Sequence, residues 1–266
     1  MITILYLTHN KLDPEVANLC REKLLLAADG KRIISISQEP LEFGDNVCVG
    51  NIGVSWRSLY VQLLAGLSEV KTEHVAIAEH DCLYTKEHFN FIPTDPNLFY
   101  YNRNCWLVQW KCNRPEHEFM YSYWPNRTAQ SQVAAFTSSF LQAVGERLYL
   151  IDAGSVNDLN KSTLLYDGMK LPAEFGVPPV MDTRRAERLY RQATSGSPAH
   201  LETLIGDHVR KWGHEIFRTS LPNLDIRHGN NFTGPKRGKK RCFELAPWGK
   251  FEDFINGKSF GPYSVA

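Results

Sequence analysis

The first 84 residues alternate between short apolar runs and helix-like segments. Continuous apolar, β-branched runs occupy residues 2–7 (ITILYL), 32–37 (RIISIS) and 74–78 (HVAIA). Such runs are typical of strands buried on both faces of a parallel sheet. A helix is predicted to begin at Asp13, followed by proline, and another over 56–67, where leucines recur at helical spacing. Strand, helix, strand, helix, strand in this order predicts an α/β sheet with right-handed crossovers.

Polar residues stand at or just beyond the end of each predicted strand. Because ligands bind beyond the carboxyl ends of strands in such sheets, we expect these side chains to converge on one site. The residues are Thr8, Asn10, Ser37, Glu39, Glu79 and Asp81.

The composition is that of a globular protein with a substantial core. Apolar residues make up 43% of the 266 residues and charged residues 22%. Lys plus Arg is 30 against 29 Asp plus Glu, a net charge of +1, which excludes a uniformly basic nucleic-acid binder. Any nucleic-acid contact would therefore come from a local patch. We expect one domain, 1–266, with a ligand-binding half at 1–97 and a second half at 98–266.

Several common motifs are absent from the chain. It contains no G-x-G-x-x-G after residue 7, no P-loop and no G-x-S-x-G, which argues against dinucleotide, P-loop and hydrolase sites. The six cysteines form no C-x-x-C pair, and the N-terminus lacks a secretory leader. No apolar stretch is long enough to span a bilayer. We expect a reduced, soluble, cytoplasmic protein without membrane insertion.

The second half of the chain differs from the first in amino-acid composition. Residues 98–110 and 117–124 are rich in aromatic side chains and predict β-strands of an extension. The segment 229–242 is rich in Gly, Lys and Arg and predicts a mobile basic loop. The remaining expected elements are helices at 137–150 (capped by Thr137), 183–194 and 199–212 and a strand near 224–228.

The triplet Glu79-His80-Asp81 is the sharpest local feature. It places two carboxylates at the end of a buried strand. Hard oxygen ligands of this kind suit Mg²⁺ or Mn²⁺ carrying a diphosphate. The alternative is a pair of solvated acids at a strand end, because isolated triplets of this type are common.

The order of four segments resembles a known enzyme family. TILYLTHNK, SISQEP, SLYVQLLAGL and VAIAEHDCLY, followed late in the chain by RHGNN and APWGK, are similar to GT-A-type glycosyltransferases related to family 2. More narrowly, they resemble a compact group common in phage and metagenomic sequences. The likeness covers most of 2–84, then 200–210 and 226–250. It implies a GT-A-like (Rossmann-like) mixed sheet flanked by helices, with an aromatic-rich extension on the acceptor side.

The resemblance also implies residue roles. Asp81 is the first metal candidate, for Mn²⁺ or Mg²⁺, and Glu79 is either a second ligand or a ribose contact. His228 matches a late histidine that completes the metal shell, with His80 as a competing nitrogen ligand. Positions implied to contact the nucleotide-sugar are Thr8, Asn10, Ser37, Glu39, Arg57, Tyr60, Gln62, Glu79, Lys236 and Arg237.

The reaction requires a base that removes the proton of an acceptor hydroxyl. By resemblance, Asp207 is favoured as this base over Glu202; the alternative for both is a solvated helix acid. Lys236 and Arg237 belong to the basic run that ends at Arg241. That run could close on the donor diphosphate, bind the phosphates of a DNA acceptor, or remain solvated.

These features together predict a metal-dependent glycosyltransferase that uses a nucleotide-sugar, most simply a UDP-sugar, with inversion. The leading acceptor is 5-hydroxymethylcytosine or another hydroxymethylpyrimidine in phage DNA. Candidate acceptor contacts are Arg103, Trp106, Trp124 and Arg127. A surface glycan or lipid-linked saccharide is the alternative acceptor. A nucleotidyltransferase or a sugar-nucleotide-binding protein is the alternative of another class, although a nucleotidyltransferase would carry a Gly-rich loop after the first strand.

Overall fold

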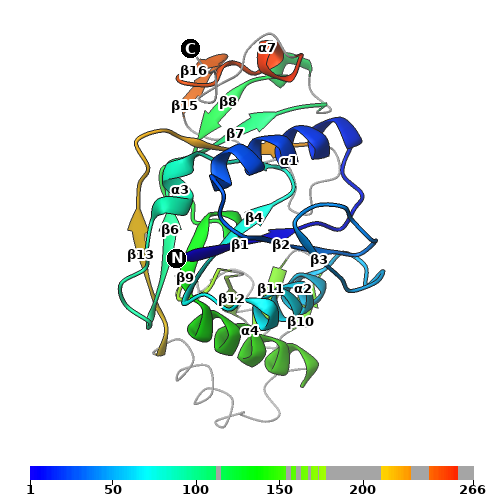
Figure 1. Cartoon of the computed structure of the whole chain (residues 1–266). Coiled ribbons are helices and arrows are strands. Elements are labelled where there is room, and N and C mark those ends of the chain that lie inside the picture. The colour runs from blue at the N-terminus through cyan, green and yellow to red at the C-terminus, as the bar shows by residue number, and fades with distance from the viewer. Residues whose placement is uncertain are drawn as a thin grey trace.

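The computed structural model describes residues 1–111, 115–153, 157–159, 163–166, 169–172, 174–177, 211–228 and 240–256. Its centre is a seven-stranded sheet in the order β13-β6-β9-β4-β1-β2-β3 (Figure 1). The strands are β1 (Ile2–Leu7), β2 (Ile33–Ser37), β3 (Asp45–Cys48), β4 (His74–Glu79), β6 (Leu98–Asn102), β9 (Val133–Phe136) and β13 (Gly213–Phe217).

Six strands of this sheet run in one direction and one opposes them. The first four strands pair in parallel, and β13 pairs in parallel with β6. Only β9 is antiparallel, to both β4 and β6. The sheet is therefore mixed, and its first four strands have the order 3-2-1-4 of doubly wound nucleotide-binding folds.

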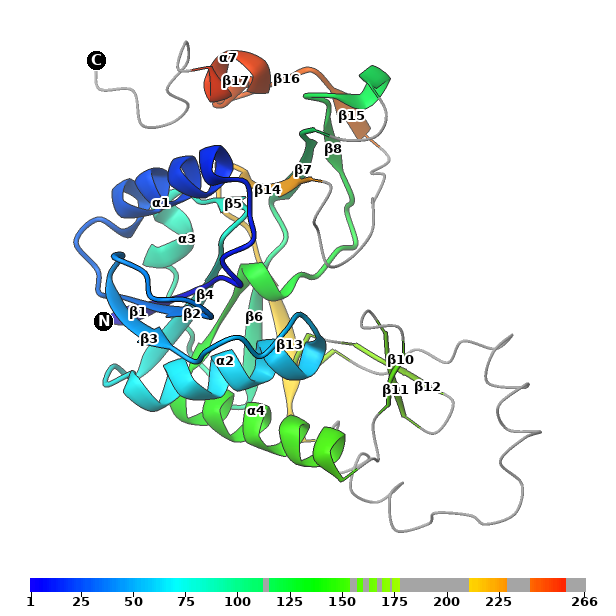
Figure 2. The same ribbon diagram turned by 90° about the vertical axis from the view of Figure 1, so that its right-hand side faces the viewer.

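Helices cover both faces of the sheet (Figure 2). Helix α1 (Pro14–Ala28) packs on one face, against Ile4 and Tyr6. Helices α2 (Trp56–Glu69) and α4 (Thr137–Asp152) pack on the other, against Leu5 and Leu7. The alternation along β1 follows from the period of two in a strand. All four of these side chains are at most 4% exposed, and each contributes about 1.5–3 kcal/mol to folding.

The ends of the first two long helices are set by their capping residues. The Asp13 carboxylate accepts the Glu15 N–H at 3.0 Å and is followed by proline at the first helical position. Ser55 caps α2 in the same way, with its hydroxyl accepting the Ser58 N–H at 3.0 Å. The chain therefore enters α2 at a defined point, directly beside the pocket described below.

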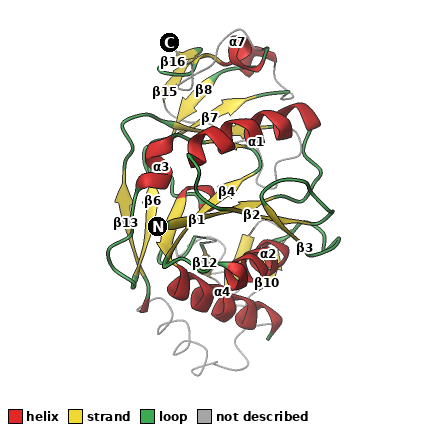
Figure 3. Ribbon diagram, viewed as in Figure 1, coloured by secondary structure: helices red, strands yellow, loops and turns green. Residues whose placement is uncertain are grey.

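A second sheet has five strands in the order β15-β8-β7-β14-β5. Its strands are β5 (Cys82–Leu83), β7 (Cys105–Gln109), β8 (Tyr121–Tyr123), β14 (Asn223–Arg227) and β15 (Lys240–Cys242). Strands β7, β8 and β15 lie above α1 in the view of Figure 3. Short elements complete the described chain. They are α3 (Lys86–Asn90), η1 (Pro115–His117), η2 (Gln130–Gln132), β10 (Asn157–Leu159), β11 (Thr163–Tyr166), β12 (Met169–Leu171), β16 (Glu244–Leu245), β17 (Gly249–Lys250) and α7 (Phe251–Ile255).

The predicted α/β class is confirmed, with a mixed sheet flanked by helices. The three early strands, both early helices and the late strand also form as predicted. Two details of the predictions differ. Residues 98–110 were predicted to form strands of the extension. They instead form one strand in each sheet, because β6 lies in the central sheet and β7 in the second sheet. Thr137 is the first residue of α4 rather than its cap, and its hydroxyl donates to the Thr72 carbonyl at 2.8 Å.

Some predicted elements lie outside the described residues. They are the helix at 183–194, nearly all of that at 199–212 and most of the basic loop 229–242. Within the part of the chain that the structure describes, no helix is both long enough and apolar enough to cross a membrane.

Candidate functional site

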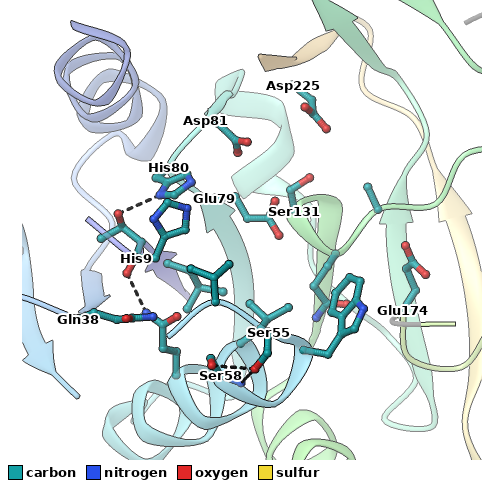
Figure 4. Close-up of a pocket in the computed structure, with 18 of the residues that line it drawn as sticks. His9, Gln38, Ser55, Ser58, Glu79, His80, Asp81, Ser131, Glu174 and Asp225 are labelled. Carbon is teal, nitrogen blue, oxygen red and sulfur yellow. Dashed lines mark hydrogen bonds between the residues drawn. The ribbon is translucent and has the colours of Figure 1, made fainter. Parts of the chain in front are cut away.

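An open pocket lies beyond the carboxyl ends of β1, β2 and β4 (Figure 4). It holds about 960 Å³ of empty space, its mouth included. Strand ends, the start of α2 and the segment before β9 form its walls. Of the six polar residues expected to converge beyond the strands, Thr8, Glu79 and Asp81 line the pocket. The residues that carry polar side chains into its lining are Thr8, His9, Gln38, Ser55, Trp56, Ser58, Gln62, Glu79, His80, Asp81, Arg127, Thr128, Gln130, Ser131, Glu174, Asp225 and Arg227.

The acidic triplet is held in place from two sides. The Glu79 N–H donates to the Tyr84 hydroxyl at 2.9 Å, and that hydroxyl donates to the Ser131 carbonyl at 3.0 Å. The Asp81 carbonyl accepts the Ile226 N–H at 2.8 Å, and β5 pairs antiparallel with β14. The pairing of β5 with β14 brings the end of β14 beside the triplet.

Asp81 and His228 meet at this point. Asp81 Oδ2 lies 3.6 Å from His228 Nε2, and their side chains are 10% and 5% exposed. Burial alone would raise the pKa of Asp81, but its close contact with His228 and the nearby basic side chains hold that pKa well below its usual range. Asp81 is therefore a carboxylate at neutral pH.

The residues present fit a divalent cation. His80, Asp81 and His228 each offer a ligand atom within 4.8 Å of the others, and Glu79, Asp81 and Cys82 form a second such group. Nitrogen and carboxylate oxygen together suit Mn²⁺, and carboxylate oxygen suits Mg²⁺.

Two neighbouring side chains shape this site further. His80 Nδ1 lies 2.9 Å from the Thr8 hydroxyl, a contact that orients the ring, and burial lowers its pKa to about 4, so the imidazole is neutral. Burial, and then the charges of Asp81 and Asp225, raise the pKa of Glu79 to about 8. A bound cation would counter both charges and favour the ionised form of Glu79.

Asp225 is a buried pocket residue that the sequence analysis missed. It is 2% exposed and forms ion pairs with Arg127 and, at 3.4 Å, with Arg227. Its position inside the apolar run Leu224–Ile226 is the signal that could have identified it, because an acid in a buried strand needs a partner.

The residues predicted to contact the nucleotide-sugar lie in different places. Thr8 and Gln62 line the pocket, and Gln62 Nε2 donates to the Thr8 and Ile36 carbonyls at 2.8 and 3.1 Å. Asn10 has φ 62° and does not line the pocket. Instead its side chain accepts the Gln38 N–H at 2.8 Å and so joins the ends of β1 and β2.

Other predicted donor contacts lie away from the pocket. Ser37 is buried in the sheet, where its hydroxyl accepts from Asn46 Nδ2 at 2.9 Å, and Glu39 is exposed. Arg57 faces solvent in an ion pair with Asp152 at 2.6 Å. Tyr60 is fully buried between α2 and α4 in the core.

Of the four predicted acceptor contacts, only Arg127 lines the pocket. Trp106 stacks on Tyr123 with ring centroids 5.2 Å apart, Trp124 is 40% exposed, and Arg103 lies outside the lining. The predicted base candidates and basic-loop contacts lie outside the described residues. These are Glu202, Asp207, Lys236 and Arg237.

Glu174 is a second carboxylate that the sequence analysis missed. It lines the side of the pocket away from the acidic triplet (Figure 4). The next residue, Phe175, is fully buried, and its carbonyl accepts the Tyr101 hydroxyl at 2.9 Å. No sequence pattern marks Glu174, because its place depends on contacts with distant residues.

No protein-family model matches the chain, and no curated protein sequence matches it. Among solved structures, a glycosyltransferase involved in glycosylation of the major capsid of PBCV-1 is similar at TM-score 0.41 and 11% identity, over 87% of this chain and 94% of that one. A Drosophila β-1,4-galactosyltransferase 7 variant, in complex with manganese, UDP-Gal and xylobiose, gives 0.34 and 10%, over 76% and 79%.

The bifunctional IspDF from Campylobacter jejuni gives TM-score 0.33 and 11% identity, over 54% of this chain and 42% of that one. The chain thus spans less than half the length of that protein. Likenesses of this strength assign neither a fold family nor an activity.

Proposed function

We propose that the protein is a metal-dependent glycosyltransferase that moves a hexosyl or pentosyl group from a nucleotide-sugar, most simply a UDP-sugar, to an acceptor hydroxyl. One observation carries the proposal. Asp81 and His228, far apart in sequence, lie 3.6 Å apart, and Asp81 lines an open pocket together with Glu79. This pocket spans the ends of β1 and β4, where doubly wound sheets bind nucleotides. The sequence resemblance to GT-A glycosyltransferases supports the same function.

In the proposed reaction, each wall of the pocket has its own role. Asp81 and His228 would hold the cation, and Glu79 and His80 lie beside them. The cation would neutralise the diphosphate leaving group when bound. The wall around Thr8 would receive the nucleoside.

The base remains a prediction from the sequence resemblance, with Asp207 favoured over Glu202. Replacement of Asp207 by Asn should nearly abolish transfer while donor binding persists. Near-normal turnover in that variant would remove Asp207 from the proposal. Inversion is likewise a prediction, and a retained anomer in the NMR spectrum of the product would refute a one-step displacement.

The acceptor is proposed on sequence grounds alone. The phage-like resemblance and the basic run 235–241 favour a hydroxymethylpyrimidine in DNA over a glycan. The described residues add no support for DNA, because Arg103, Trp106 and Trp124 do not gather at the pocket.

A matrix of UDP-sugars against plain DNA, 5-hydroxymethylcytosine DNA and simple glycans, read by mass spectrometry, tests both levels of the proposal. The expected result is a sugar mass added to modified DNA and dependent on Mn²⁺ or Mg²⁺. Transfer to glycans alone would keep the transferase and remove the DNA acceptor. UDP and Mn²⁺ binding without UDP release from any pair would favour a binding protein, and release of pyrophosphate from a nucleoside triphosphate would favour a nucleotidyltransferase.

A further inference from the structure

The wall of the pocket beyond β4 is formed by residues 127–131. This wall is fixed to the acidic triplet rather than loosely placed beside it. Helix η2 contacts β4, and the Tyr84 hydroxyl joins the Glu79 N–H to the Ser131 carbonyl through bonds of 2.9 and 3.0 Å. A side chain on this wall therefore has a defined position relative to the candidate metal ligands.

Gln130 lies on this wall with its amide unsatisfied. The residue is 5% exposed, and neither Oε1 nor Nε2 has a hydrogen-bond partner among the described residues. Its neighbour Gln132 is 1% exposed but fully engaged. There, Oε1 accepts from Asn223 at 2.7 Å and Nε2 donates to the Ser131 hydroxyl at 3.3 Å. A buried amide without partners costs free energy, so an unsatisfied amide on a residue of the pocket wall calls for a ligand that completes it.

The position of Gln130 along the sheet edge indicates which part of a ligand it would meet. The strands run in the order β2-β1-β4-β9. The pocket residues follow the same order, from Gln38 after β2 and Thr8 after β1, through Asp81 after β4, to Gln130 before β9. A ligand whose diphosphate lies at Asp81 therefore has one end toward Thr8 and Gln38 and the other toward Gln130.

We infer that Gln130 is a specificity-determining residue that binds a hydroxyl group of the transferred sugar. This inference rests on the proposed function, which places the nucleoside at the Thr8 end. A carboxamide offers one donor group and one acceptor, and a sugar hydroxyl both donates and accepts. Arg127 adds donors on the same wall, because its Nε and Nη1 have no hydrogen-bond partner within the described chain.

The test compares Gln130→Met with wild type in calorimetric titrations containing Mn²⁺, using UDP, UDP-glucose, UDP-galactose, UDP-N-acetylglucosamine and UDP-xylose. Methionine has a similar length but cannot replace the amide hydrogen bonds. We expect UDP itself to bind within about twofold of wild type, while the preferred UDP-sugar binds about 10- to 100-fold more weakly. The differences in affinity among the UDP-sugars should become smaller accordingly.

A second readout separates ligand recognition from a structural role. The melting temperature of the ligand-free Gln130→Met chain should equal or exceed that of wild type, because the substitution removes an unsatisfied buried amide. A structural glutamine would give the opposite result. Gln142→Met is the matched control, since Gln142 is exposed on α4 and donates to Glu146 at 2.9 Å. The Gln142→Met substitution should change neither the affinity for UDP-sugars nor the preference among them.

The outcomes distinguish this inference from the proposed function. Wild-type protein that binds no UDP with Mn²⁺ contradicts the proposed function and the inference with it. Wild-type protein that binds UDP-sugars, with Gln130→Met retaining the same affinities and ranking, contradicts the inference alone. Equal weakening of the binding of UDP and of UDP-sugars in Gln130→Met also contradicts the inference. So does a Gln130→Met chain that fails to fold or melts at a lower temperature than wild type.

Discussion

The buried ion-pair cluster around Asp225 makes the sharpest prediction about stability. Asp225 pairs with Arg127 and Arg227, and the three side chains are 3%, 11% and 6% exposed. Substitution Asp225→Asn keeps the size and shape of the side chain but removes its charge. Two guanidinium groups then remain buried without their shared carboxylate.

Removing one partner of a buried ion pair typically costs about 3–5 kcal/mol. The lower end applies here, because the charge of Asp225 raises the pKa of Glu79, and its removal reduces the cost of keeping that carboxyl protonated at neutral pH. We expect a loss of about 3 kcal/mol in the free energy of unfolding. The double variant Asp225→Asn/Arg127→Met should cost about 2 kcal/mol less than the sum of the two single variants, because it also removes the Arg127 charge that has lost its carboxylate partner.

Urea denaturation followed by circular dichroism measures these differences through the midpoint, provided the slope is unchanged. Asp45→Asn is the matched control. Asp45 pairs with Arg32 at 2.7 Å, but the two side chains are 61% and 41% exposed. An exposed pair of this kind contributes about 0–1 kcal/mol. A loss below about 1 kcal/mol for Asp225→Asn, or strict additivity in the double variant, would refute this reasoning.

Two further predictions concern pH and packing. Burial lowers the pKa of His88 from 6.5 to about 3, so the unfolded chain binds the proton first and stability falls as pH drops below 6.5. His88→Phe should remove about 2 kcal/mol of the loss between pH 7 and 5 in urea titrations, and equal losses in both proteins would contradict this. Gly66→Ala places a Cβ 2.6 Å from Ile36 Cδ1 and should cost about 1–3 kcal/mol. Gly145→Ala, with no heavy atom within 4 Å, should instead be neutral or stabilising by up to about 1 kcal/mol; equal effects would contradict the packing argument.

Local patterns were enough to predict the first half of the fold. Apolar runs identified β1, β2 and β4, the cap Asp13 identified α1, and the helical spacing of leucines identified α2, because burial and helix ends leave signatures within a few residues. The strand β3 was missed, since its sequence DNVC is mostly exposed and has no apolar pattern. The sheet to which β6 belongs depends on pairing with β9 and β13, which local sequence does not encode.

The site was predictable in part for the same reason. Trp56, Ser58, Leu59 and Gln62 line the pocket from the first half of α2, whereas Tyr60 of the same segment is buried in the core. Helical spacing does not separate the two sets, because Trp56 and Ser58 are also two residues apart and both line the pocket. The resemblance to a known family indicated that metal-ligand candidates far apart in sequence belong to one site. Hydrophobic periodicity cannot indicate this, because it relates only residues that are near in sequence.

Buried polar side chains were the least predictable part of the site. Asp225 and Gln130 acquire their importance from burial beside the pocket, and burial at these positions is set by the pairing of β14 with β5 and by the contact of η2 with β4. Neither contact has a sequence signature of its own.

The central claim is that Asp81 holds a divalent cation through which the protein binds a nucleotide diphosphate. Calorimetric titration of UDP, with Mn²⁺ and with excess EDTA, tests it most directly in wild type, Asp81→Asn and the control Asp29→Asn, an exposed acid paired with Lys86 at 2.9 Å. We predict UDP binding that requires Mn²⁺, is at least about 10-fold weaker in Asp81→Asn and is unchanged in Asp29→Asn. UDP binding of equal affinity in EDTA, or in Asp81→Asn, would contradict the claim.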